Sequence, residues 1–125
     1  MRTLLFLTIG LLASCASVSQ HARQGDLVGQ WRYADATQSC RYVFSTDGTF
    51  RADVAIRGQI VSKFTGRWTV KGDALFYEYL TDQRGEVTPG STDRDKLLAV
   101  EKDYFIIEAA DGSHRRYNRI EQGST

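Results

Sequence analysis

The sequence has little proline, histidine or cysteine and almost no net charge. Its 125 residues include one Pro, two His and two Cys, and 16 basic side chains stand against 15 acidic ones. This balance lacks the basic surface that a nucleic-acid-binding protein needs, so we expect no nucleic-acid partner. Two isolated histidines do not supply a histidine-rich metal site or a Ser-His-Asp triad. We therefore expect no metal, no cofactor and no enzymatic activity, and the remaining composition is that of one small globular domain.

Long apolar runs are also scarce. The longest covers residues 4–13, follows the positively charged Arg2, and is interrupted only by Thr8 and Gly10. A run of this length is too short to span a bilayer and is typical of the core of a signal peptide.

The apolar run ends in Leu12-Ala13-Ser14-Cys15, which resembles the lipobox of bacterial lipoproteins. The resemblance implies a signal peptide over residues 1–14 and a lipid anchor on Cys15. Ala16 in place of Asp further implies sorting to the outer membrane, with the domain facing the periplasm. The alternative is ordinary signal cleavage, in which Ser14-Cys15-Ala16 serves as a small-x-small site.

Residues 15–26 are polar and aperiodic, so we expect a flexible tether between the lipid and the domain. Lipidation of Cys15 would leave Cys40 without a partner in its own chain. Cys40 is then either buried or open to pairing with another chain. Because it alternates in phase with Tyr42 and Phe44, we favour a buried packing role with a raised thiol pKa.

Turn signals such as Asp47-Gly48 and Asp111-Gly112 recur from residue 27 onward, at intervals typical of an all-β protein. Eight strands are predicted, over residues 27–34, 39–46, 49–57, 59–71, 74–81, 97–102, 104–110 and 113–120, with a loop over 82–96 and a tail over 121–125. An open sheet of eight strands would expose two long edges, and closure removes both. We therefore predict an eight-stranded antiparallel up-and-down barrel over residues 27–120, without helices.

Gly29-Gln30-Trp31 resembles the first strand of lipocalin-like barrels, which carries a Gly-x-Trp motif. The segments over 44–50 and 66–75 also resemble hairpins of small bacterial lipocalin-like lipoproteins. In that family an arginine of the last strand lies across the Trp ring near the closed end of the barrel. Arg119 is the matching residue here and would make a cation–π contact with Trp31. Arg116 is the alternative partner, because strand alternation puts Ile120 on the face opposite Arg119.

Alternation along the predicted strands directs an aromatic-rich set of side chains into the barrel. This set comprises Tyr33, Tyr42, Phe44, Phe50, Val54, Ile56, Phe64, Trp68, Tyr77, Tyr79, Phe105, Ile107 and Tyr117. Barrels of eight strands are just wide enough to be filled by side chains or to hold one small ligand. Both interiors remain open from the sequence. The resemblance implies binding of a small apolar or amphipathic molecule.

The strands over 74–81 and 104–110 carry large apolar residues on both faces. Placing Glu78 and Glu108 outward, because a buried unpaired carboxylate is costly, leaves four apolar side chains outside. These are Phe76, Leu80, Tyr104 and Ile106. They form a candidate contact patch for an envelope protein partner, unless the tether or the 82–96 loop covers them.

The remaining polar candidates favour simple roles. His114 is expected at the surface of the last strand. Asp93 and Asp95 lack the other ligands of a calcium site and are expected to be solvated loop charges. The sequence therefore favours a lipid-anchored binding protein first, an interaction module such as an inhibitor or structural subunit second, and an enzyme last.

Overall fold

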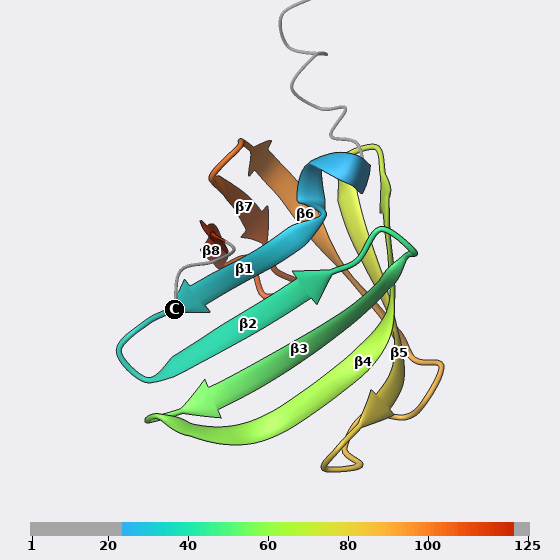
Figure 1. Cartoon of the computed structure of the whole chain (residues 1–125), viewed down its shortest axis with the longest axis vertical. Helices are drawn as coiled ribbons and strands as arrows, with labels where there is room; N and C mark the ends of the chain where they lie inside the picture. The colour runs from blue at the N-terminus through green and yellow to red at the C-terminus, as the bar shows by residue number, and fades with distance from the viewer. Residues whose placement is uncertain (1–23, 122–125) are drawn as a thin grey trace, which may run out of the picture.

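The structure, a computed structural model, describes residues 24–121. A short 3₁₀ helix, η1 (Gln24–Leu27), precedes eight strands. The strands are β1 (Gly29–Ala34), β2 (Gln38–Phe44), β3 (Thr49–Ile56), β4 (Gln59–Lys71), β5 (Ala74–Asp82), β6 (Thr92–Val100), β7 (Tyr104–Glu108) and β8 (His114–Ile120). Each pairs antiparallel with its neighbour and β8 pairs with β1, which closes the barrel (Figure 1). The predicted all-β fold is confirmed. The signal peptide, Cys15 and the tether up to residue 23 lie outside the described residues.

Three register shifts bend the strands around the barrel. The first lies at Val54/Ala55 in the β3–β4 ladder. The second leaves Leu80 of β5 without a partner opposite Thr65 and Gly66, and the third leaves Leu98 of β6 unpaired. Leu80 and Leu98 are 38% and 40% exposed, because a bulge turns its extra residue away from the ladder and increases the local twist.

Strand β6 begins five residues earlier than the predicted strand. Thr92–Lys96 pair with Glu78–Ala74 of β5, so the predicted 82–96 loop is wrong over its last five residues. The charged side chains of this segment have low intrinsic strand preference, and pairing with β5 overrides it. The loop that remains is held by Asp82, whose carboxylate accepts hydrogen bonds from the backbone N–H groups of Arg84, Glu86 and Val87.

The first strand also begins later than predicted, because residues 24–27 form η1 across one end of the barrel (Figure 1). The Gln24 side chain contacts β4: its Nε2 donates to the Trp68 carbonyl at 3.5 Å and its Oε1 accepts from the Val70 N–H at 3.3 Å. Leu27 is fully buried. The last part of the predicted tether is therefore attached to the barrel, and we call the end that η1 covers the closed end.

Trp31 and Arg119 join the first and last strands at the closed end. They are directly paired across the β1–β8 ladder, and the Arg119 guanidinium carbon lies 4.1 Å from the centre of the Trp31 ring. Trp31 Nε1 donates to the Leu27 carbonyl at 2.8 Å. Arg119 donates to the carbonyls of Lys102, Val28 and Asp26 at 2.7, 2.9 and 3.2 Å. The alternative partner, Arg116, instead lies over the ring of Tyr104.

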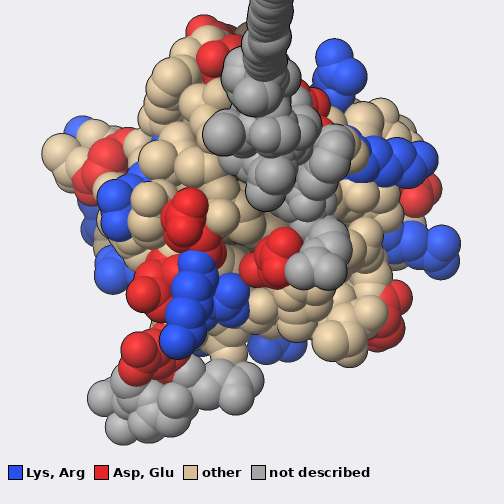
Figure 2. Space-filling view, turned by 90° about the horizontal axis from the view of Figure 1, so that it is seen from above, with Lys and Arg blue, Asp and Glu red and all other residues tan. Residues whose placement is uncertain are grey.

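Gly29 makes this arrangement possible. Its φ of 134° lies in a region that other residues rarely adopt, and a Cβ atom at this position would collide with the Arg119 guanidinium. The glycine of the Gly-x-Trp motif therefore provides the space through which Arg119 reaches the carbonyls around η1. Figure 2 looks down on this end and shows Lys and Arg side chains mixed with Asp and Glu side chains around it.

Candidate functional site

Apolar side chains fill the barrel core toward the closed end. Five residues predicted to line a ligand site are fully packed there: Phe44, Phe50, Trp68, Phe105 and Ile107. The rings of Phe44 and Trp68 lie 4.7 Å apart, and Trp68 Nε1 donates to the Ser45 carbonyl at 3.1 Å. These five residues are inward as predicted but do not line the pocket described below, because strand alternation identifies inward side chains but not their depth along the barrel axis.

The opposite end of the barrel is open. A pocket of about 470 Å³ lies between the start of β2, the ends of β3 and β5, the start of β6 and the β7–β8 turn. Its lining consists of Gln38, Cys40, Tyr42, Val54, Tyr77, Tyr79, Asp93, Asp95, Ala109, Ala110, Asp111, Arg115 and Tyr117. Five of the predicted lining residues are among them, and four of those five are tyrosines.

Three other predicted lining residues lie beside or beyond the pocket. Tyr33 packs against Tyr117 and Phe64 against Tyr79, with ring centres 5.7 Å apart in each pair. Ile56 is 40% exposed at the end of β3. It keeps the phase of Val54 and pairs with Gln38, but it lies at the rim, where β3 ends, and so it is largely exposed.

The tyrosines form one continuous cluster. Tyr42 contacts Tyr77 and Tyr117, with ring centres 5.9 and 5.7 Å apart, and Tyr77 stacks on Tyr79 at 6.3 Å. Burial raises the pKa of Tyr42 and Tyr77 well above the usual value and the pKa of Tyr79 to about 12. These hydroxyls therefore stay neutral at physiological pH and can donate hydrogen bonds to a ligand.

The charged part of the pocket was missed by the sequence analysis. Asp93 and Asp95 belong to β6 and line the pocket, which corrects their assignment to a loop; Asp93 is exposed, as expected for a solvated charge, whereas Asp95 is half-buried. They alternate in phase with the buried Leu97. This Asp-x-Asp-x-Leu spacing was the available signal for an inward carboxylate pair. Arg115 of β8 lies above the ring of Tyr33, 5.7 Å from its centre, and completes the charged lining.

Asp95 is the most perturbed carboxylate of the pocket. Loss of hydration raises its pKa to about 6, and the nearby negative charge of Asp93 acts in the same direction. A hydrogen bond from Tyr77 and the positive charge of Arg115 oppose the shift. The ion pairs in residues 24–121 are Arg84 with Glu86 and His114 with Glu108. Neither Asp93 nor Asp95 has a cationic partner of this kind.

The Asp95→Asn variant is expected to be more stable than the wild type at neutral pH and equal to it near pH 4. The folded protein binds the Asp95 proton more tightly than the unfolded chain. The stability that the protonated Asp95 contributes to the folded protein is therefore fully present below the unfolded pKa and is lost as the pH rises through about 6. Because the side chain is partly hydrated, we expect a gain of about 1 kcal/mol at neutral pH. Urea unfolding at both pH values checks this, and a less stable variant at neutral pH would contradict it.

Cys40 and His114 have the positions expected for structural residues. Cys40 is buried at the wall of the pocket, and loss of hydration raises its pKa, so the side chain stays a neutral thiol. His114 is exposed on β8, with Nε2 3.2 Å from the Glu108 carboxylate. In the described part of the chain, no group of three or more His, Cys, Asp or Glu side chains is placed to hold a metal ion.

The predicted outer patch is divided by β6. Phe76 and Leu80 lie on β5 and Tyr104 and Ile106 on β7, and the exposed Arg94 and Lys96 of β6 lie between them. Leu80 borders a depression shared with β2 and β3, whereas Phe76 borders another with β4. Arg116 lies over Tyr104, 3.9 Å from its ring centre. The four residues do not form one apolar surface, because charged residues assigned to a loop belong to the strand between them.

One solved structure in particular matches this architecture. A lipocalin-like protein from Bacteroides uniformis superposes with a TM-score of 0.56 and 22% identity, covering 77% of this chain and 100% of that one. The chain has a lipocalin-like fold. No protein-family model and no curated protein matches the sequence.

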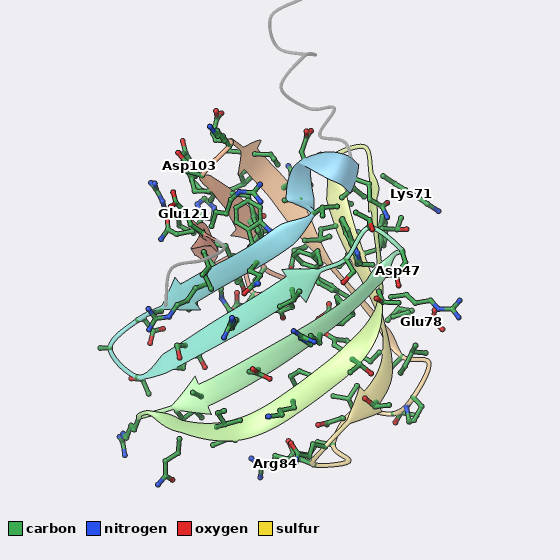
Figure 3. All side chains as sticks on the ribbon, viewed as in Figure 1. Asp47, Lys71, Glu78, Arg84, Asp103 and Glu121 are labelled. Carbon is green, nitrogen blue, oxygen red and sulfur yellow. The ribbon has the colours of Figure 1, made fainter. Side chains whose placement is uncertain are left out.

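In this lipocalin-like barrel, the Trp31–Arg119 closure and the pocket lie at opposite ends. Residues 24–121 contain no helix that is long and apolar enough to cross a membrane. Charged residues on the outer surface point away from the barrel, as Lys71, Glu78 and Arg84 show in Figure 3. Asp93, Asp95 and Arg115 instead line the pocket.

Proposed function

We propose that the chain is a lipid-anchored protein of the bacterial cell envelope that binds a small amphipathic molecule at the open end of its barrel. The observation that carries the proposal is the pocket of about 470 Å³ opposite the closed end. Its volume is within the usual range for small-molecule sites. Its lining combines tyrosine rings with carboxylates and a guanidinium, which favours an amphipathic ligand over a purely apolar one.

The geometry of the two ends supports an anchored arrangement. The chain enters the described domain at Gln24, and η1 lies across the closed end. A lipid on Cys15 would therefore attach the protein to the membrane through the closed end. The open end would face the surrounding aqueous compartment, where a ligand can reach it. Anchors with more than one acyl chain hold proteins on membranes durably.

Ligand binding can be tested with three compounds that share one skeleton: phenethylamine, phenethyl alcohol and hydrocinnamate. We expect at least one to bind the lipidated protein in nanodiscs, as measured by isothermal titration calorimetry. The Tyr79→Ala variant should weaken that binding by about tenfold, since it removes an aromatic contact in the pocket. Tyr104→Ala removes an outer tyrosine and should leave affinity unchanged. Failure of all three compounds to bind, or equal effects of both variants, would contradict the proposal.

The anchor can be tested through its attachment residue. In a diderm bacterium, the wild-type protein should incorporate labelled palmitate and sediment with the outer membrane. The Cys15→Ser variant should lose both properties, because sulfur carries the lipid. Cys40→Ser removes the other thiol of the chain and should retain both. Palmitate incorporation by the Cys15→Ser variant would rule out this anchor.

A further inference from the structure

The pocket contains a pair of carboxylates on one wall. Asp93 and Asp95 occupy neighbouring inward positions of β6, so both side chains project from the same face of the strand. Asp95 is half-buried, and neither residue forms one of the ion pairs of the described chain. Asp93 is exposed, but its negative charge disfavours the ionised form of the partly buried Asp95, and a positive group beside the pair would relieve this.

The pocket has one positive group, Arg115, whose charge lowers the pKa of Asp95 but which forms no ion pair with Asp93 or Asp95. Asp111 adds a third carboxylate, which accepts hydrogen bonds from the N–H and hydroxyl of Ser113 in the β7–β8 turn. Arg115, the one cationic side chain of the lining, lies over Tyr33 and hydrogen-bonds to Tyr117. Three carboxylates therefore face one guanidinium, and the lining of the pocket is formally negative.

The aromatic lining also favours a positively charged ligand. Tyr42, Tyr77, Tyr79 and Tyr117 contribute aromatic rings and neutral hydroxyls to the lining. A cation placed over such a ring is attracted by its quadrupole, and the attraction increases when water is excluded. The same rings provide apolar area for the body of an organic molecule. No group of three or more His, Cys, Asp or Glu side chains in the described residues is placed to hold a metal ion, and an inorganic ion would not use these rings.

The carboxylate pair can be approached from two sides. Asp93, Asp95, Ala109 and Ala110 also line a second depression of about 560 Å³. It lies on the outside, where the ladder between β6 and β7 begins only at Lys96 and Glu108. The first residues of β6 thus have pairing on the β5 side and open space toward the β7–β8 turn. A charged group of a ligand can therefore reach Asp93 and Asp95 without displacing the closed-end core.

We infer that the pocket takes a small organic cation, an amine whose charged nitrogen lies beside Asp93 and Asp95 and whose apolar body lies among the tyrosine rings. This inference rests on the proposed binding function and names the class of its ligand. The bound amine would form the ion pair with Asp93 and Asp95 that no side chain of the described residues forms.

The three compounds of one skeleton separate charge from shape. At neutral pH, phenethylamine should bind about ten times more tightly than phenethyl alcohol, and hydrocinnamate more weakly than either. Asp95→Asn and Asp93→Asn should each reduce the preference for the amine to about threefold or less, with little change for the alcohol. Asp103→Asn is the matched control, since it removes one carboxylate from the outer surface near the closed end (Figure 3), and it should leave the preference unchanged.

The outcomes distinguish the inference from the function on which it rests. If the alcohol or the carboxylate binds as tightly as the amine, the inference is overturned and the binding function stands. If none of the three binds, both fall. If Asp103→Asn reduces the preference as much as Asp95→Asn, the effect is one of overall charge and the proposed location is wrong. Asp95→Asn remains informative because it is expected to fold at least as stably as the wild type.

Discussion

Replacing Trp31 by alanine is expected to lower the free energy of unfolding by about 4 kcal/mol, which is in the range for large aromatic-to-alanine changes in cores. Trp31 is completely buried, and its ring packs edge-on against Phe105 with centres 4.8 Å apart. The substitution also removes the surface on which Arg119 lies and leaves the Leu27 carbonyl without its indole donor. The closed end would lose its core and its attachment to η1 together.

Urea unfolding followed by far-UV circular dichroism measures this loss. Trp31→Phe serves as the matched variant, because it keeps an aromatic ring but removes the indole N–H; we expect about 2 kcal/mol for it. Ligand affinity in Trp31→Phe should be unchanged, since the pocket is at the other end of the barrel. A loss below about 1 kcal/mol for Trp31→Ala would be inconsistent with a packed closed end.

Replacing Gly66 by alanine is expected to cost about 3 kcal/mol, near the upper end for overpacking of a core. Gly66 lies on β4 at the register shift opposite β5, and a Cβ atom there would collide with the Glu78 carbonyl and the Phe50 ring. The carbonyl belongs to the backbone of the neighbouring strand, so the β4–β5 pairing itself must move. The same absence of a side chain lets the Phe50 ring lie against β4.

The matched control for this substitution is Gly25→Ala. A Cβ atom at Gly25 would meet nothing within 4 Å, and its φ is outside the left-handed region. We expect a change within about 0.5 kcal/mol, as is usual for substitutions away from packed features. Thermal and urea unfolding of the two variants measure the difference. Equal stabilities for Gly66→Ala and Gly25→Ala would show that the β4–β5 contact is looser than the structure indicates.

The strands with one apolar face could be predicted from the sequence because their alternation has a period of two residues. This holds for β2, β3 and most of β4, and closure follows from the cost of exposed sheet edges. Strand β6 was predicted only from its apolar second half. Its first half carries alternating charges, and only the position of β5 beside it makes these residues a strand. The attachment of η1 depends on the contacts of Gln24 with β4, which no local pattern encodes.

The candidate site was predicted only in part. Alternation identified Tyr42, Tyr77, Tyr79 and Tyr117 as inward, but it grouped them with phenylalanines that fill the closed half. Which inward residues line a pocket depends on their height along the barrel axis, and this height is set by strand tilt and by the three register shifts. Asp93 and Asp95 were missed because charge is normally placed outside a barrel.

The most direct test of the account is to map binding on the isotope-labelled protein by amide and indole NMR spectra during titration with phenethylamine, phenethyl alcohol and hydrocinnamate in turn. The indole N–H groups of Trp31 and Trp68 are held by backbone carbonyls near the closed end. The account predicts shifts around Tyr79, Asp95 and Tyr117 and none at the two indoles. Shifts at the indoles or on the outer wall, with none at the open end, would contradict it.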